Sequence, residues 1–228
     1  MKRLAVLSGA GVSKESGINT FRDSDGMWEQ YPVEEVASIE GWYRNPGLVL
    51  DFYNARRRDI QNKQPNEAHR IIAALESDFQ VTVITQNIDN LHEKAGSTNV
   101  IHLHGEITKA RGENSLTPVY DIGYSDIRLG DKDSRGQQLR PDIVWFGEAV
   151  PMIEKAAEIV SECDILLVIG TSLVVYPAAG LVNYIRHGVP IYLVDPSPMQ
   201  LHYKYYTQIQ DVATAGMRKF LELLPSLK

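Results

Sequence analysis

Five short runs of apolar, mostly β-branched residues are spread along the chain and predict buried strands. Segments with the apolar spacing of helices lie between most of them. This alternation predicts an α/β fold with a doubly wound, mostly parallel, Rossmann-like sheet. The predicted strands are Leu4–Leu7, Val81–Ile84, Val100–Leu103, Ile165–Ile169 and Ile191–Val194. The predicted helices are Pro46–Gln61, a segment over 65–77 that Asn66 would cap, Met152–Ser161, Ala178–His187 and Ala215–Leu224.

Each predicted strand runs directly into glycine or polar residues. In open parallel sheets, ligands bind outside the carboxyl ends of the strands. Random loop chemistry supplies two or three such ends, so five together favour a polar ligand site along one edge of the sheet. The residues at these ends are 9–11, 86–89, 104–105, 170–172 and Asp195.

One connection departs from this alternation. Residues 106–140 are too many for a bare connection in a compact domain, so they predict either a small inserted lobe or a mobile loop. We expect a single domain over residues 1–228, with the lobe at about 106–140 and a helical module at about 30–65.

Composition narrows the function classes. Hydrophobic residues make up 43% of the 228, enough for a buried core. A net charge of -6 and a pI near 5.5 argue against general nucleic-acid binding. No stretch reaches membrane-spanning length, and the apolar run before Gly9 is too short for a signal peptide. We therefore expect a cytoplasmic protein without nucleic-acid or membrane partners, while the oligomeric state stays unknown.

The first strand leads into a glycine-rich turn, GAGVSKESG, at residues 9–17. Glycines allow the backbone to approach a pyrophosphate, and a following helix offers N–H donors. The spacing departs from the dinucleotide-binding pattern at its sixth position, Lys14. Taken alone, a dinucleotide site and an ordinary tight turn explain this motif about equally well.

Five motifs in fixed order resemble the sirtuin family of NAD-dependent protein-lysine deacylases. They are GAGVSKESGINTFRD, TQNIDNLHEKAG, HLHGE, DIVWFGE and GTSLVVYPAAG. The resemblance spans nearly the whole chain and implies NAD as cofactor and acylated lysines of proteins or peptides as substrates. In the implied reaction the acyl oxygen attacks the ribose carbon as nicotinamide leaves, and the products are free lysine and O-acyl-ADP-ribose.

The resemblance also implies the cofactor contacts. For Asn87 and Asp89 the alternative is a helix cap, and for Thr171 and Ser172 a hydroxyl-rich turn. Asn19, Thr20 and Asp195 differ from the residues common in the family. By position, Gly9, Ala10 and Gly11 would hold the pyrophosphate, Phe21, Arg22 and Trp28 would lie near the nicotinamide, Gln86 would contact the ribose, Asn87, Ile88 and Asp89 would line the nicotinamide pocket, and Gly170, Thr171, Ser172, Asp195 and Ala213 would lie on the adenosine side.

Two histidines are candidates for the catalytic base. His102 and His104 alternate onto one face of a strand end, so spacing does not choose between them, and either is also explained as a hydrogen-bonded core histidine. The resemblance selects His104, with Asn87 as a second catalytic residue. An imidazole suits a general base because its ordinary pKa is near neutral. The same resemblance has Val144 and Phe146 line the lysine channel, with the substrate peptide added as a strand between VWFGE and LVVYP; core packing is the alternative.

Most sirtuins carry four zinc-binding cysteines in the segment matching 106–140. This chain has one cysteine, Cys163, outside that segment, and a structural zinc site needs four nitrogen or sulfur donors. We therefore expect no zinc and a lobe ordered by apolar contacts. The apolar residues available for this are Leu116, Val119, Tyr120, Ile122, Tyr124, Ile127 and Leu129.

Tyr53 and Arg56 resemble the Tyr-x-x-Arg pair of class III sirtuins, which remove succinyl and malonyl groups. Three residues apart, they share one helix face, and a guanidinium and a phenol suit a carboxylate. The alternative for Arg56 is a weak surface ion pair. Arg57 and Arg58 are expected to be solvated.

Two other functions use the same cofactor. The chain would be an NAD-dependent ADP-ribosyltransferase or NAD hydrolase if the acceptor were different, and a non-catalytic NAD or ADP-ribose sensor if it bound without reaction. The Tyr53–Arg56 pair argues against the first, since neither reaction needs a carboxylate clamp. His104 argues against the second, since binding needs no base.

Overall fold

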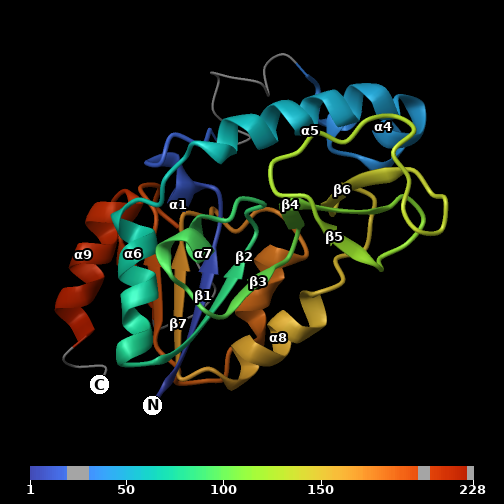
Figure 1. Ribbon diagram of the computed structural model, residues 1–228. Helices are drawn as coiled ribbons and strands as arrows, with labels where there is room; N and C mark the ends of the chain where they lie inside the picture. The colour runs from blue at the N-terminus through green and yellow to red at the C-terminus, as the bar shows by residue number, and fades with distance from the viewer. Residues whose placement is uncertain (20–30, 200–205, 225–228) are drawn as a thin grey trace.

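The computed structural model describes residues 1–19, 31–199 and 206–224. At its centre is a six-stranded parallel sheet in the order β3-β2-β1-β7-β8-β9 (Figure 1). All five predicted strands are confirmed. β9 was missed because its three residues, TQI, contain no apolar run. The strands are β1 (Arg3–Ser8), β2 (Gln80–Thr85), β3 (Val100–His102), β7 (Ile165–Ile169), β8 (Ile191–Val194) and β9 (Thr207–Ile209).

Helices cover both faces of this sheet, which confirms the doubly wound arrangement. Along β1, Leu4 and Val6 pack against α6 and α9, whereas Ala5 and Leu7 pack against α8 and η2. Because both faces are buried, the strands read as continuous apolar runs. The helices around the sheet are α1 (Gly11–Lys14), α6 (Glu67–Ala74), η1 (Leu75–Ser77), α7 (Leu91–Ala95), α8 (Ile153–Glu162), η2 (Ala178–Tyr184) and α9 (Ala213–Leu223).

The predicted helix over 178–187 takes a different form. It is a 3₁₀ helix that ends at Tyr184, and it contains Gly180 and Val182, which favour an α-helix weakly. The cap predicted at Asn66 is confirmed, since its side chain accepts a bond of 2.9 Å from the amide of Ala68. Among the described helices, none has the length and apolar character needed to cross a membrane.

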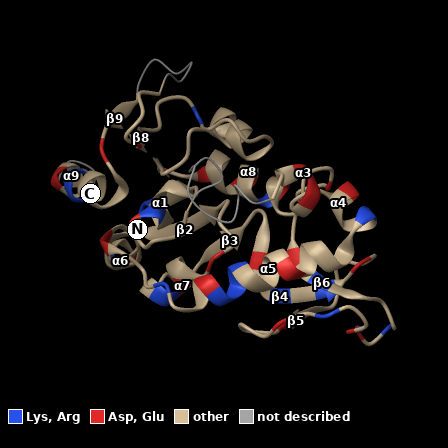
Figure 2. Cartoon of the chain, turned by 90° about the horizontal axis from the view of Figure 1, so that it is seen from above, with Lys and Arg blue, Asp and Glu red and all other residues tan. Residues whose placement is uncertain are grey.

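A second layer of helices consists of α3 (Val33–Val36), α4 (Ile39–Arg44) and α5 (Pro46–Gln61). The bounds predicted for α5 are confirmed. Asn45 caps this helix by accepting from the amide of Leu48 at 3.1 Å, and Pro46 occupies its first turn. Seen from above in Figure 2, α5 lies alongside β4 and β6.

The long connection forms a small lobe rather than a loop. It is a three-stranded antiparallel sheet, β5-β4-β6, made of β4 (Gly105–Gly112), β5 (Val119–Asp121) and β6 (Leu139–Ile143). Ile107, Ala110, Ile127 and Ile143 belong to one apolar cluster with residues of α4 and α5. The apolar set predicted to order the lobe was therefore only partly right. Ile127 is buried and Ile122 and Tyr124 pack against the cluster, but Leu116, Val119 and Leu129 are exposed.

Arg57 was wrongly predicted to be solvated. It is fully buried, because its face of α5 is turned toward the lobe. Its Nε donates to the carbonyl of Ile107 at 2.7 Å and its Nη1 to Oδ1 of Asn54 at 2.7 Å. Asn54 in turn bonds both backbone groups of Ile127, at 2.8 and 3.0 Å. The hydrogen bonds among Asn54, Arg57 and the backbone of Ile107 and Ile127 therefore attach the lobe to α5; we call them the polar stitch. Arg58 is exposed, as predicted.

Candidate active site

The ends of β1 and β7 meet in close backbone contact. The amide of Gly9 donates to Ile169 at 3.0 Å, and that of Gly11 to Gly170 at 2.8 Å. A Cβ added to Gly11 would lie 2.7 Å from Cα of Gly170, and one at Gly9 would lie 2.7 Å from Cβ of Thr171. The packing of this tight turn against the end of β7 therefore already requires both glycines.

The loop after β2 bridges the two turns. Gln86 donates from Nε2 to the hydroxyl of Thr171 at 3.1 Å. Asn87 donates from Nδ2 to the carbonyl of Gly9 and to the hydroxyl of Ser13, each at 3.2 Å. Gln86 and Asn87, predicted to contact the ribose and the nicotinamide, are thus brought beside the glycine turn, and neither side chain caps a helix.

Asp89 is buried and has two partners. Its Oδ1 accepts from the amide of Leu91 at 3.0 Å, at the start of α7, and its Oδ2 accepts from the hydroxyl of Ser13 at 3.0 Å. The alternative of a capping role therefore holds for one of its oxygens. Burial raises the pKa of Asp89, and the two donors only partly oppose it. Ile88, half-buried, accepts from the amide of Ile107 at 2.9 Å and so ties this loop to the lobe.

A buried histidine pair beneath this loop was missed in the sequence. His69 and His92 pack edge to face with ring centroids 4.9 Å apart. The Nε2 of His92 lies 2.9 Å from the hydroxyl of Ser8, and that of His69 lies 3.4 Å from the hydroxyl of Ser13. Burial lowers the pKa of His69 to about 4 and that of His92 well below its ordinary value, so both rings are neutral. The sequence signal that could have revealed this pair was the presence of polar residues, such as Ser8 and His69, at positions that face the core in a strand or helix.

His104 has the geometry of a general base. Its Nδ1 lies 3.0 Å from the carbonyl of Gln86, and because a carbonyl only accepts, Nδ1 carries the proton. In the neutral ring, Nε2 then has a lone pair with which to take a proton. Burial lowers the pKa of His104, with the bond to Gln86 opposing, which favours this neutral form.

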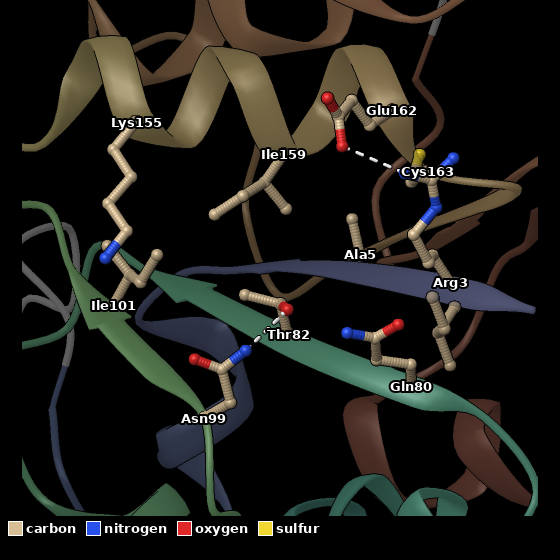
Figure 3. A pocket seen from close by; sticks show the side chains of 11 residues that line it. Arg3, Ala5, Gln80, Thr82, Asn99, Ile101, Lys155, Ile159, Glu162 and Cys163 are labelled. Atoms are coloured by element: carbon tan, nitrogen blue, oxygen red, sulfur yellow. Dashed lines mark hydrogen bonds and ion pairs between the residues drawn. The ribbon is translucent and has the colours of Figure 1, made fainter. Parts of the chain in front are cut away.

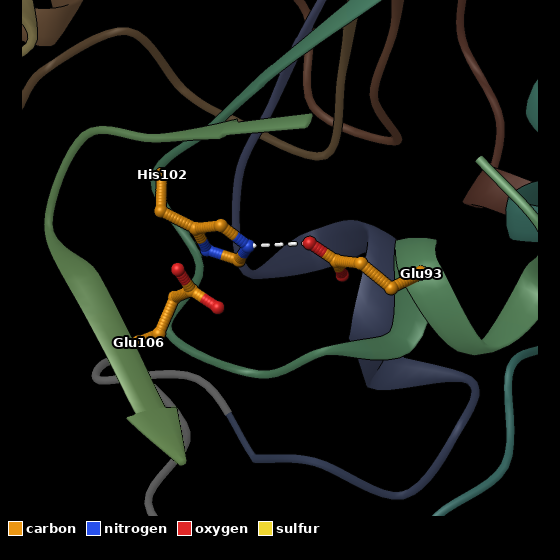
Figure 4. Close-up of side chains that lie close together, drawn as sticks. All are labelled: Glu93, His102 and Glu106. Atoms are coloured by element: carbon orange, nitrogen blue, oxygen red, sulfur yellow. Dashed lines mark hydrogen bonds and ion pairs between the residues drawn. The ribbon is translucent and has the colours of Figure 1, made fainter. Parts of the chain in front are cut away.

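His102 is used differently, which separates the two histidines. Its Nδ1 donates to the carbonyl of Asn87 at 2.9 Å, and its Nε2 lies 2.8 Å from Oε1 of Glu93 (Figure 4). Burial lowers the pKa of His102, but the bond and charge of Glu93 and the charge of Glu106 outweigh it and raise the pKa. Glu106 also pairs with Lys109. Both ring nitrogens of His102 are therefore engaged, and its neighbours favour the protonated form.

The residues predicted on the adenosine side lie at the ends of β7 and β8 or beyond them. Gly170 has a positive φ of 61°, and Thr171 bonds Gln86. Asp195 follows β8 and accepts from the amide of Ser197 at 2.9 Å. Ala213 begins α9 and is buried in the main core. Ser172 lies between Thr171 and the exposed residues 174–176. Three further predicted residues, Phe21, Arg22 and Trp28, lie outside the described part of the chain.

Tyr53 and Arg56 share the buried face of α5, with only 2% and 7% of their surfaces exposed. A surface ion pair is thereby excluded for Arg56. The phenol oxygen of Tyr53 accepts from Nε1 of Trp145 at 2.9 Å. Burial lowers the pKa of Arg56, while the charges of Tyr53, Asp59 and Asp89 oppose the shift. Arg56 is thus electrostatically coupled to Asp89 in the loop beside the glycine turn.

The segment DIVWFGE contacts both His104, through Val144, and Tyr53, through Trp145. The amide of Val144 donates to the carbonyl of His104 at 3.0 Å. Val144 is half-buried, whereas 54% of Phe146 is exposed. Both backbone groups of Phe146 already pair with Ala37 and Ile39, at 2.9 and 3.0 Å. A substrate strand along this segment would therefore have to use backbone groups other than those of Phe146.

A separate cavity of about 350 Å³ lies against α8, near the start of β1 and β2 (Figure 3). Arg3 and Gln80, the first residues of these strands, line it together with Lys155 and Glu162. The residues described above follow the opposite ends of the strands. This cavity is therefore not part of the candidate active site.

Comparison with known proteins identifies the family. Residues 9–177, well over half of the chain, match the Sir2 family. The chain belongs to the Sir2 family. An NAD-dependent protein deacylase from Bacteroides thetaiotaomicron is 50% identical over 98% of this chain and 98% of its own. One from Helicobacter pylori is 48% identical over 100% of this chain and 98% of its own.

Solved Sir2 structures share the fold. A Sir2 homologue in complex with NAD superposes with a TM-score of 0.88 at 37% identity, over 99% of this chain and 90% of its own. A mutant homologue in complex with ADP-ribose gives 0.89 at 37% identity, over 99% of this chain and 93% of its own. The mostly parallel, Rossmann-like sheet with a small antiparallel lobe is thus the Sir2 fold in this chain.

Proposed function

We propose that this member of the Sir2 family removes succinyl or malonyl groups from protein lysines in preference to acetyl groups. The enzyme is an NAD-dependent protein-lysine deacylase, as the relatives named above are. The acyl preference is our proposal, and one observation carries it: Tyr53 and Arg56 are buried together on α5, beside the loop that contains Asp89.

A buried arginine favours an anionic partner. Burial disfavours the charged guanidinium of Arg56, and an incoming carboxylate would offset that cost while accepting two parallel bonds. Tyr53 remains a phenol because burial raises its pKa to about 12, so it can donate a third bond. An acetyl group offers none of these contacts. A charge-assisted bond of ~1.5–3 kcal/mol corresponds to a preference for the acidic acyl group over acetyl of about ten- to a hundredfold.

The residues around the glycine turn fit NAD. Gly9 and Gly11 lie at the end of β1 without side chains, packed against Gly170 and Thr171, and Gln86, Asn87 and Asp89 present polar groups from one loop. When bound, NAD supplies the ribose carbon that accepts the acyl oxygen as nicotinamide leaves. His104 is suited to remove the ribose hydroxyl proton through Nε2, since its Nδ1 is occupied by Gln86.

We also propose that the lobe works without zinc. Residues 106–140 contain no cysteine and no histidine, so they do not fit a tetrahedral zinc site. In its place, Arg57 and Asn54 fasten the lobe to α5. Arg140 adds a bidentate pair with Glu148, at 2.7 and 2.8 Å.

The test is the kcat/KM ratio for succinyl- over acetyl-lysine peptides of one sequence. Arg56→Met should lower this ratio by about ten- to a hundredfold. Arg56→Lys keeps the charge but loses the fork, so its ratio should fall less. Arg58→Met, on an exposed residue of the same helix, serves as matched control and should leave the ratio alone. Equal losses on both peptides in Arg56→Met would disprove the clamp.

A further inference from the structure

The phenol of Tyr53 has a partner that determines its direction. Nε1 of Trp145 lies 2.9 Å from the phenol oxygen, and both side chains are only 2% exposed. An indole N–H donates and never accepts. The oxygen of Tyr53 is therefore the acceptor, and its own hydrogen must point away from Trp145. The raised pKa of the phenol keeps that hydrogen in place at neutral pH.

Trp145 is itself held on two sides. The Cζ atom of Arg140 lies 3.4 Å from the centroid of the indole, so the guanidinium stacks on the ring. The backbone amide of Trp145 donates to Oε2 of Glu148 at 2.9 Å. Arg140 and Glu148 form the bidentate pair of the lobe, and Arg140 is fully buried and also donates to Ile143 at 2.8 Å. Turning the ring would break its stack on Arg140 and its bond to Tyr53.

These contacts link the lobe to Tyr53 on α5. Arg140 lies in β6, an edge strand of the small sheet, and Trp145 lies two residues beyond the end of that strand. Tyr53 lies on α5, 92 positions away from Trp145 in sequence. We propose that Trp145 is a specificity-determining positioning residue: its indole directs the Tyr53 hydroxyl toward the carboxylate of an acidic acyl group, and the Arg140–Glu148 pair holds the indole in place.

The proposal rests on the proposed function and extends it. A succinyl or malonyl carboxylate can accept from Tyr53, whereas an acetyl methyl cannot. Losing the indole donor should therefore affect acidic acyl groups selectively. Trp145→Phe keeps an aromatic ring for Arg140 to stack on but removes the N–H, so that the phenol hydroxyl can rotate toward other acceptors.

The experiment is a double-mutant cycle of Trp145→Phe and Tyr53→Phe, with kcat and KM measured on succinyl- and acetyl-lysine peptides. Trp145→Phe should lower the succinyl-to-acetyl ratio of kcat/KM about fivefold, mainly by raising KM for the succinyl peptide. The double variant should match Tyr53→Phe alone, because Trp145 acts through that phenol. Arg140→Lys, which loses the fork and weakens the stack, should lower the ratio in the same direction and covers the case in which Trp145→Phe folds poorly.

The outcomes separate the two claims. If Arg56→Met lowers the ratio as expected while Trp145→Phe and Arg140→Lys leave it unchanged, the clamp stands and this inference is wrong. Additive losses in the cycle, or equal losses on both peptides, overturn it as well, since they indicate a purely structural role. If the wild-type enzyme shows no succinyl preference and Arg56→Met affects both peptides equally, the proposed function itself fails.

Discussion

Replacing Asn54 by alanine should destabilise the protein strongly, because one amide holds three buried groups. Its Nδ2 donates to the carbonyl of Ile127 at 2.8 Å, and its Oδ1 accepts from the amide of Ile127 at 3.0 Å and from Nη1 of Arg57 at 2.7 Å. Asn54, Arg57 and Ile127 are 6%, 0% and 2% exposed, so water cannot replace the lost partner.

The size of the effect follows from these contacts. Leaving a buried donor or acceptor without a partner costs about 1–3 kcal/mol, and the bond to the guanidinium lies toward the upper end. We therefore expect the free energy of unfolding to fall by about 3–5 kcal/mol. For a chain of this size, that corresponds to a melting temperature lower by about 6–20 °C.

Urea denaturation would measure the change, and hydrogen exchange would locate it. The Ile127 amide should lose most of its protection, since its acceptor is gone. Asn99→Ala is a matched control: Asn99 donates to Thr82 at 2.7 Å but is exposed, so that change should cost less than about 0.5 kcal/mol. If both variants were equally stable, the stitch between α5 and the lobe would not hold the lobe in place.

Three further predictions concern protons and metals. Burial lowers the pKa of His104, so kcat/KM should rise with pH below about 6.5 and level off near neutrality. His104→Asn should lower kcat/KM at least about a hundredfold, and a rise of the wild-type kcat/KM confined to alkaline pH would exclude His104 as the base. His69 has a folded pKa of about 4, so its neutral ring contributes roughly 3 kcal/mol to the free energy of unfolding above pH 6.5, and this contribution is lost as the pH falls toward 4. His69→Gln should make the free energy of unfolding, measured in urea, depend less on pH in this range, and an unchanged pH dependence would contradict the prediction. EDTA should leave activity and melting temperature unchanged, because residues 106–140 contain none of the cysteines or histidines that form structural zinc sites. A loss restored by zinc would show a missed site.

Local patterns in the sequence predicted the elements well. The five apolar strands needed no tertiary information, and Asn45 with Pro46 marks the start of α5. Arg57 shows where such reasoning stops. Nothing in its neighbourhood says that β4 will cover its face of the helix, so it reads as one of three similar surface arginines. The set of apolar residues predicted to order the lobe was only partly right for the same reason, since the exposed Leu116 and Leu129 look as apolar as the buried Ile127.

The candidate site was predictable as a set of residues but not as a set of contacts. Period-two spacing puts His102 and His104 on one face of the strand end. Only the contacts show the difference: Nε2 of His102 is engaged by Glu93, whereas His104 bonds Gln86 through Nδ1 and keeps Nε2 for a proton. The contact of Tyr53 with Trp145 joins segments that no local pattern connects. The buried pair His69 and His92 was missed because two single histidines far apart in the sequence form no repeating pattern that would predict their contact.

The most direct test follows a succinyl-lysine peptide by mass spectrometry with the wild-type enzyme, in the presence and absence of NAD. We predict loss of the succinyl mass only with NAD, with nicotinamide and a succinylated ADP-ribose formed in equal amounts and a faster reaction than with the acetyl peptide. NAD consumed while the peptide stays intact, or acyl loss without NAD, would contradict the account.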